Sequence, residues 1–211
     1  MTRNARLRLT LVGAGLAAIL VSAGCSLAPK ADRPAFVPAG STWVTERRDT
    51  GSFGNGVSRT SSKSLGAQTW QGRPVIALEG PEGTIHSDPT TGNWVAFVKD
   101  TSPLATYNPP LGYDWPLTVG KTWTRNTRVT TPQRTMDLQS TFNVEAHEEV
   151  TVPAGTFKVF RIRYTDQYGE NMQWWSPEHG LWVKTKAQRN SSHPAGAGTR
   201  ETQMVSLTIP K

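Results

Sequence analysis

Histidines are the side chains best suited to metal binding or acid–base chemistry, and the sequence contains four of them. His147 is followed by two glutamates, as in a helical zinc motif, but the fourth position after it holds Thr where that motif needs a second His. His86 with Asp88, and Glu178 with His179, fall in predicted turns, where each pair could join a third ligand or simply face solvent. We therefore expect no metal site and no cofactor.

The sequence lacks the usual patterns of nucleophilic catalysis. There is no Gly-x-Ser-x-Gly segment, and Cys25 is the only cysteine. The glycines at positions 51, 54 and 56 lack the strand-then-helix context of a phosphate-binding loop and indicate a hairpin turn. Folding could still bring two carboxylates to the spacing that glycosidases use, so an enzyme acting on envelope glycans stays as a third hypothesis. We expect a protein that is not an enzyme.

Cys25 is informative because of what precedes it. Three arginines in the first eight residues are followed by an uncharged apolar run, Leu9–Val21. This run of 13 residues is shorter than the ~20 residues that cross a bilayer. Small residues, Ser22–Gly24, separate it from Cys25. The segment 1–24 therefore reads as an export signal.

Residues 22–25 resemble the lipobox of bacterial lipoproteins, with Ser22 where Leu is commonest. The resemblance implies cleavage before Cys25, a thioether to diacylglycerol and an acyl chain such as palmitate on the new amine. Ser26, rather than Asp, implies transfer to the outer membrane, with the protein on the periplasmic face. The alternative is an ordinary cleaved signal peptide with an incidental Cys.

Three segments follow from this reading: a lipoprotein signal peptide (1–24), a lipidated Cys with a flexible, proline-rich tether (25–38), and a single β domain (39–211). The whole chain has 23 basic and 16 acidic side chains. Without the three arginines of residues 1–24, the balance is 20 to 16, a net charge of +4. A basic surface can meet anionic lipid or simply be solvated. We expect no nucleic-acid partner, because an exported protein seldom meets one.

The segment Met136–Val152 shows the clearest secondary-structure pattern. Apolar residues occupy its even positions and polar residues its odd positions, with Ser140 and Glu148 as the breaks. Such alternation predicts a strand with one wet face, which is typical of antiparallel sheets. A straight strand of this length is improbable, so we expect a bulge or bend near 147–149.

Similar runs separated by Gly- and Pro-rich turns predict about ten strands. The fold class is therefore all-β: an antiparallel, strongly curved sheet, sandwich or barrel-like. Gly40–Trp43 and Gly120–Trp123 share a Gly-x-Thr-Trp pattern at an offset of 80, and Trp94 and Trp174 share this offset. The pattern suggests two similar halves, about 40–105 and 120–190, although chance in a chain rich in Trp and Thr explains it equally well.

Three further segments carry a family resemblance: Pro116–Trp123, Glu149–Ile162 and Trp174–Lys184. They are similar to the P-L-x-V-G-x-x-W, V-P-A-G-T-F and W-x-S-P-x-x-G segments of a family of uncharacterised bacterial envelope proteins and lipoproteins. The resemblance covers about residues 109–190. It implies a β-rich envelope domain without an established activity, and it supplies no catalytic residue.

Tryptophans are the remaining candidates for a binding site. Five of the eight lie within 70 residues: Trp115, Trp123, Trp174, Trp175 and Trp182. Trp174 and Trp175 are adjacent, so on a strand they face opposite sides, and one of them leaves the core. Such an aromatic can line a cavity or simply cover a sheet edge. We assign the five to the binding of a ligand.

Two non-catalytic functions fit these residues. The first is a membrane-anchored module that binds an apolar or lipid-like ligand over the tryptophans. The second is a structural or interaction subunit of an envelope complex, which would dock an envelope protein through Trp175 or a strand edge. In both cases the membrane is a partner through the N-terminal lipid.

Overall fold

The computed structural model describes residues 28–211, so the predicted signal peptide and Cys25 lie outside the described range. Strands make up the regular secondary structure of this range. They are β1 (Lys30–Ala31), β2 (Thr42–Gly51), β3 (Gly56–Trp70), β4 (Arg73–Gly80), β5 (Gly83–Ser87), β6 (Trp94–Lys99), β7 (Ser102–Leu111), β8 (Leu117–Thr118), β9 (Thr122–Thr130), β10 (Thr135–Val152), β11 (Gly155–Asp166), β12 (Gly169–Ser176), β13 (Leu181–Arg189) and β14 (Gly198–Thr208). Between residues 28 and 211, no helix has the length and apolar character needed to cross a membrane.

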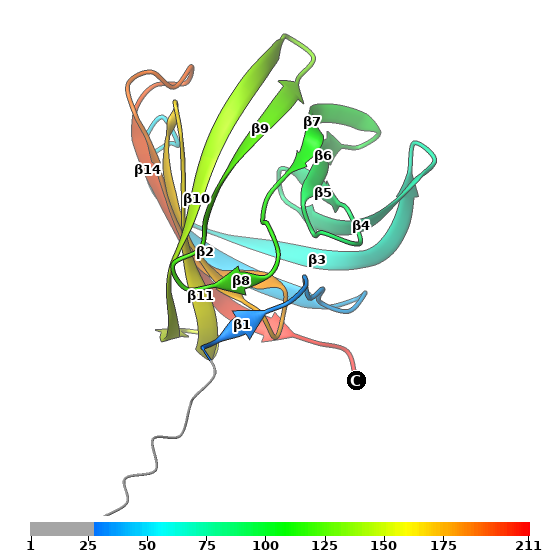
Figure 1. Ribbon diagram of the computed structural model, residues 1–211, viewed down its shortest axis with the longest axis vertical. Coiled ribbons are helices and arrows are strands. Elements are labelled where there is room, and N and C mark those ends of the chain that lie inside the picture. The colour runs from blue at the N-terminus through cyan, green and yellow to red at the C-terminus, as the bar shows by residue number, and fades with distance from the viewer. Residues whose placement is uncertain (1–27) are drawn as a thin grey trace, which may run out of the picture.

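Twelve of the strands form one closed antiparallel barrel (Figure 1). Neighbours in sequence pair with each other, and two further pairings close the ring: β14 with β2, and β7 with β9. The first seam covers the whole of β2, whereas the second covers only Thr106–Asn108 on β7. The all-β, antiparallel, barrel-like fold predicted from the sequence is confirmed, with more strands than expected.

Strand β10 shows how the residue pattern produces the wall of the barrel. Leu138, Ser140, Phe142 and Val144 are buried, while the polar residues between them are mostly exposed. Ser140, which interrupted the apolar pattern, is also fully buried on this face. The register shifts between Val144 and Ala146, a little before the expected bend. This bulge lets a long strand follow the curve of the barrel.

The barrel consists of two similar six-stranded halves, β2–β7 and β9–β14. Each half begins with the same three backbone hydrogen bonds, displaced by 80 residues. They are Gly40 N to Ser64 O, Ser64 N to Ser41 O and Ser41 N to Pro38 O in the first half, and Gly120 N to Val144 O, Val144 N to Lys121 O and Lys121 N to Thr118 O in the second. The bulges in β3 and β10, after Ser64 and Val144, keep this displacement. Such agreement supports a true internal repeat over a chance pattern.

The predicted correspondence between Trp94 and Trp174, at the same offset of 80, does not hold for their side chains. Trp94 lines the interior of the barrel, while Trp174 pairs with Lys184 and Glu148 away from the cavities. Strands β10 and β11, with 18 and 12 residues, are longer than their counterparts β3 and β4, with 15 and 8, so an equal offset no longer marks equivalent residues this far along the chain.

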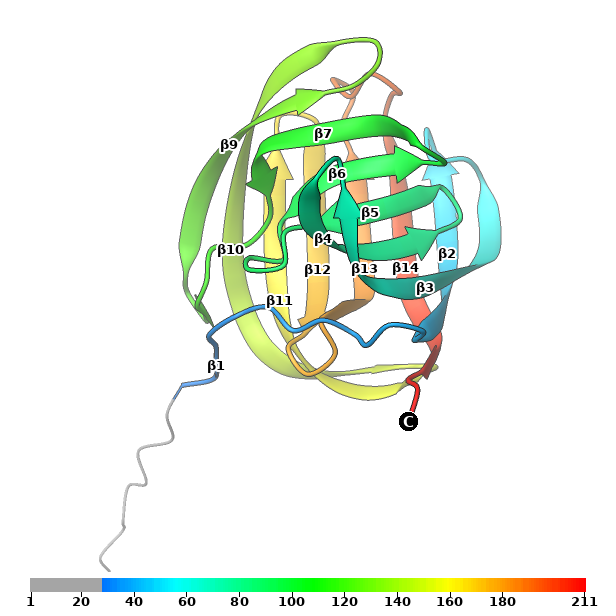
Figure 2. The same ribbon diagram turned by 90° about the vertical axis from the view of Figure 1, so that its right-hand side faces the viewer.

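Residues 28–41, which we call the strap, close one end of the barrel (Figure 2). β1 pairs with β8, Val37 is 3% exposed, and the Ser64 hydroxyl donates to the Val37 carbonyl at 3.0 Å. From residue 28 onward the chain therefore packs against the barrel, in contrast to the flexible tether expected for 25–38. Its prolines keep the segment extended, as expected, but an extended segment can also pair and pack.

The barrel has two distinct ends. The strap and the turn at residues 177–180 meet at one end, which we call the strap end, because a Cβ on Gly180 would overlap the Ala35 carbonyl. β12 and β13 run from there to the turns at 167–168 and 190–197. The second of these turns contacts the turn at 52–55, since Ser52 N donates to Ala197 O at 2.9 Å. We call this opposite rim the turn end. Apolar clusters that include Ala31, Val37 and Leu117 fill the strap end.

Candidate functional site

Two adjoining cavities occupy the interior of the barrel. Their volumes are about 430 Å³ and 480 Å³. They adjoin because Trp94, Tyr113, Gln173 and Trp182 line both. Each is within the range of ~300–1,000 Å³ that small-molecule sites usually have. The barrel interior is thus the candidate binding site.

Strands β12 and β13 supply one wall of the first cavity. Because side chains alternate across a strand, Gly169, Asn171 and Gln173 share the inner face of β12. On β13, Arg189 lies opposite Gly169, and Ala187 lies opposite Asn171. Gly169 and Ala187 are small, which leaves space beside the longer polar side chains. This wall therefore presents hydrogen-bonding groups to an open volume.

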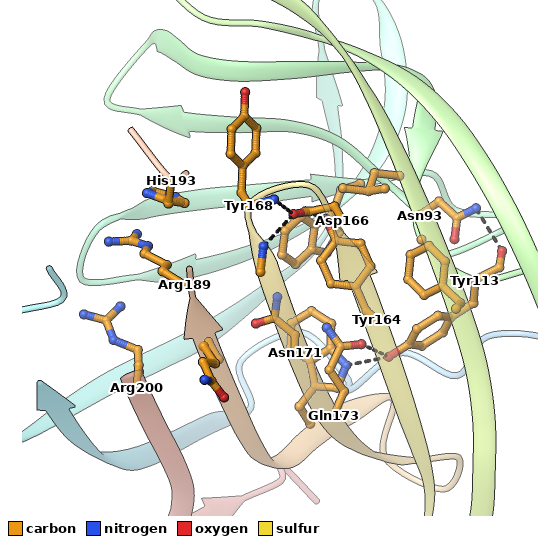
Figure 3. A pocket seen from close by; sticks show the side chains of 18 of the residues that line it. Asn93, Tyr113, Tyr164, Asp166, Tyr168, Asn171, Gln173, Arg189, His193 and Arg200 are labelled. Carbon is orange, nitrogen blue, oxygen red and sulfur yellow. Dashed lines mark hydrogen bonds between the residues drawn. The ribbon is translucent and has the colours of Figure 1, made fainter. Parts of the chain in front are cut away.

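Three side chains linked by hydrogen bonds lie in the middle of the cavity. Trp182 Nε1 donates to the Tyr113 hydroxyl at 2.8 Å, and this hydroxyl donates to Gln173 Oε1 at 2.7 Å (Figure 3). Burial raises the pKa of Tyr113, so its phenol stays protonated and keeps this direction of donation. Gln173 Oε1 is therefore occupied, and the Gln173 NH₂ group is available to a ligand.

Aromatic side chains form the apolar part of the lining. Trp94 packs edge-on against Trp182, with ring centroids 5.5 Å apart, and tilts against Tyr107 at 6.1 Å. Phe97 and Leu78 continue this surface in the second cavity. Such a lining suits an apolar chain, because it removes apolar ligand surface from water.

At the turn end, Arg200 is held by acidic partners. Its Nε and Nη2 each donate to the Asp49 carboxylate at 2.8 Å, and its Nη1 lies 3.5 Å from Glu82. These donors hold the pKa of Asp49 below its usual range, with the hydrogen bond from Arg200 as the largest cause. Arg47 also pairs with Glu82. The charge of Arg200 is therefore balanced within the protein.

Arg189 lies beside this pair in a different environment. Its guanidinium carbon is 3.7 Å from the centre of the Phe53 ring, and Nη1 donates to the Ser52 carbonyl at 3.3 Å. No carboxylate of residues 28–211 forms an ion pair with it. Burial, followed by the charge of Arg200, lowers the pKa of Arg189. Arg189 is thus a cation in the cavity wall with no carboxylate in direct contact, and Glu82 and Asp49 act on it only through space.

Asp166 is the acidic group of the first cavity. It accepts the Tyr164 hydroxyl at 2.5 Å and the backbone N–H groups of Tyr168 and Gly169 at 2.7 and 3.1 Å. Burial, followed by the hydrogen bond to Asp166, raises the pKa of Tyr164, which therefore remains a donor. Three donors thus share the charge of Asp166 within the structure.

His193 completes the turn end of the cavity. Its Nδ1 accepts the Ala195 N–H at 3.0 Å. Burial, followed by the charge of Arg189, lowers its pKa, so the neutral ring carries its proton on Nε2 at pH 7. His193 is then a neutral donor.

The structure brings three of the five predicted tryptophans to the cavities. Trp182 lines both, and Trp115 and Trp175 line the second. Trp115 Nε1 donates to the Thr91 carbonyl at 2.7 Å, while Trp175 is 5% exposed and packs edge-on against Trp115.

Trp123 and Trp174 line neither cavity. Trp123 stacks on Phe142, with centroids 5.0 Å apart. Trp174 turns away from the cavities, where Nε1 donates to Glu148 and the Lys184 ammonium lies over the ring at 4.9 Å. Of the adjacent pair, Trp175 thus enters the barrel interior and Trp174 leaves it.

One of the two predicted histidine turns is wrong, whereas Glu178 and His179 do lie in the turn at residues 177–180. His86 is a strand residue that is 9% exposed and packs against Trp70, because β5 extends to Ser87. Asp88 pairs with Arg73 in the turn that follows. Over residues 28–211, no group of three His, Cys, Asp or Glu side chains is placed to hold a metal ion.

Sequence reasoning missed the polar half of the cavity. The signal that could have found Arg189 is the strand run 181–189, in which Thr185, Ala187 and Arg189 share one face. A long cation on the same face as small residues indicates a polar wall rather than a solvated surface. Trp94 was noted only as part of the repeat.

Comparisons with known proteins find distant structural similarity to this barrel. No protein-family model and no curated protein matches the sequence. The hypothetical lipoprotein YmcC from Escherichia coli matches over 82% of this chain and 86% of its own, with 15% identity and a TM-score of 0.47.

Two further solved structures are similar at the same level. A "putative lipoprotein" from Parabacteroides distasonis matches over 84% of this chain and 100% of its own, with 15% identity and a TM-score of 0.44. A "putative exported protein with YmcC-like fold" from Bacteroides fragilis matches over 84% and 99%, with 11% identity and a TM-score of 0.45. Likeness at this distance carries no function across to this chain.

Proposed function

We propose that this protein binds an apolar or lipid-like ligand inside its barrel, in a non-catalytic role. The observation that carries the proposal is the pair of adjoining cavities lined by Trp94 and Trp182. Buried aromatic walls with a few convergent polar groups are typical of small-molecule sites. An interior filled with side chains would have opposed this reading.

We also propose that the protein is anchored in the outer membrane through a lipid on Cys25 and faces the periplasm. The support is the residue pattern of 1–26 described above. Two residues lie between Cys25 and residue 28, so the three steps from one to the other reach at most about 11 Å. The strap end would then lie near the bilayer, and the turn end with Arg189 would face away from it.

The alternative, docking onto an envelope complex, gains no specific support. Trp175, expected to mark the docking surface, is buried. Every barrel strand pairs on both sides, although the β7–β9 seam is paired only over Thr106–Asn108 and leaves Thr122–Thr127 of β9 without a strand partner there.

Native mass spectrometry tests the ligand proposal. The chain from Ser26 onward, exported to the periplasm and purified without detergent, is measured before and after organic extraction. It contains all fourteen described strands. We expect an adduct of lipid mass that extraction removes and that decanol or decanoate replaces.

The matched variants are Trp182→Ala, in the cavity, and Trp174→Ala, outside it. The first should lose the adduct and the second should keep it. A bare protein that also fails to take up decanol and decanoate would refute the proposal. For the anchor, a palmitate analogue should label the full chain but not its Cys25→Ser variant, and equal labelling of both would exclude lipidation at this residue.

A further inference from the structure

Building on the proposed function, we propose that the barrel selects an anionic amphiphile, with the acidic headgroup on Arg189 at the turn end and the apolar tail between Trp94 and Trp182. Carboxylates and phosphate esters both present a pair of neighbouring oxygens that a guanidinium binds with two hydrogen bonds.

Arg189 and Arg200 lie close together but differ in their partners. Both arginines line the first cavity and contact Phe53, which lies 3.7 Å from Arg189 and 4.7 Å from Arg200. Arg200 has two short hydrogen bonds to Asp49. Arg189 has only neutral oxygens of Ser52, at 3.3 and 3.4 Å. Partly removing a cation from water costs free energy when no carboxylate pairs with it, and a bound anion would offset this cost.

The side chains of the β12–β13 wall change in character from the turn end toward the interior. From the turn end inward, the inner face of β12 and β13 presents Arg189, then Asn171, then Gln173, then Trp182. Charge, amide donors and aromatic surface thus follow one another along the cavity. An acidic headgroup followed by an alkyl chain matches this order.

Nearby groups are compatible with an anion. His193 is neutral at pH 7 and can donate from Nε2, as its hydrogen bond to Ala195 and its lowered pKa indicate. Asp166 is the opposing charge, and its oxygens are already engaged by Tyr164 and two backbone N–H groups. It lies on the same wall as Arg189, two strands away, because Gly169 on β12 pairs with Asp166 on one side and with Arg189 on the other (Figure 3).

Calorimetric titration of the extracted chain from Ser26 onward tests the inference. The ligands are decanoate, decanol and acetate: the whole amphiphile, its neutral counterpart and the headgroup with almost no tail. We expect decanoate to bind at least about tenfold more tightly than decanol, since a hydrogen bond to a charged group contributes on this scale. Acetate should bind far more weakly than either.

Arg189→Gln should reduce decanoate affinity to that of decanol and leave decanol affinity unchanged. Arg189→Lys, which keeps the charge, should retain part of the preference, and this variant keeps the test valid if Arg189→Gln lowers the unfolding temperature. The matched control is Arg128→Gln, since Arg128 pairs with Asp137 on the exposed surface.

The outcomes separate the two proposals. Equal affinity for decanoate and decanol, or a preference that survives Arg189→Gln, overturns the headgroup inference and leaves the apolar site standing. Failure of both decanol and decanoate to bind overturns the proposed function and this inference with it. If acetate bound as tightly as decanoate, the inference that the ligand is an amphiphile would also be overturned, because the tail would then contribute nothing to affinity.

Discussion

Asp49 and Arg200 face each other across the seam between β2 and β14, joined by two hydrogen bonds of 2.8 Å. They are directly opposite in the register of this seam. The pair therefore links the first and last long strands of the barrel, and it also fixes the wall beside Arg189.

Asp49→Asn should lower the free energy of unfolding by about 1–2 kcal/mol at pH 7, because the charged hydrogen bonds weaken where solvent partly reaches them. The folded-state pKa of Asp49 is lowered below the ordinary 3.8. Its contribution is therefore complete above 3.8 and is lost as pH falls through the folded-state value. Urea unfolding at pH 7 and at acid pH checks this. The exposed counterpart Asp137→Asn should leave stability unchanged, and a loss of stability from Asp49→Asn that persists at acid pH would contradict the assignment.

Tyr113→Phe should destabilise the barrel by about 1–3 kcal/mol. The change keeps the aromatic packing but leaves Trp182 Nε1 and Gln173 Oε1 without their shared partner. Urea unfolding measures the loss. Tyr168→Phe is the matched control, since its hydroxyl has only a 3.7 Å contact with the Met136 sulfur. Equal effects of the two substitutions would mean that the Tyr113 hydrogen bonds contribute little.

Gly180→Ala should release the strap. The added Cβ would overlap the Ala35 carbonyl, and the backbone has a φ of +66°. Gly72→Ala separates the two causes, because Gly72 has a φ of +75° with open space around it, so only strain of about 1 kcal/mol applies there. Hydrogen exchange of the amides between 31 and 37 should accelerate in Gly180→Ala alone. Unchanged protection would show that the strap adjusts without leaving the barrel.

Stability should fall as pH drops through 6.5. Burial lowers the folded-state pKa of His86 below its usual 6.5, so the unfolded chain takes up the proton more readily. Thermal unfolding between pH 8 and 5 checks the trend, and His86→Phe should flatten it. Adding His193→Gln should flatten it further, since burial also lowers that pKa. A slope that His86→Phe does not change would assign the trend to other groups.

Local patterns in the sequence were enough to predict most of the barrel strands, but not β7, whose sequence contains three prolines. The alternation of Met136–Val152 predicts β10, because a strand with one buried face needs a period of two. Closure of the barrel could not be predicted in this way. It depends on partners such as Thr42 and Thr208, far apart in the chain, and neither carries a signal of the other.

The sequence identifies which residue types could form the site, but it does not show which side of a strand each side chain faces. Trp174 and Trp175 must face opposite sides, but the sequence does not say which side is the interior. A register shift lies between them, so alternation cannot be carried along β12 without knowing it. Arg189 escaped notice because a single arginine at the end of a strand is usually solvated. Its role depends on Phe53, which a distant turn brings to it.

The repeated hydrogen bonds at Gly40 and Gly120 also bear on ancestry. A single six-stranded half has two open edges, and a second copy of the same half can cover both. The barrel is therefore what fusion of a homodimeric ancestor would leave. Once fused, the two copies were free to diverge. One seam is now paired along the whole of β2 and the other only over Thr106–Asn108, and only the second copy contributes Arg189.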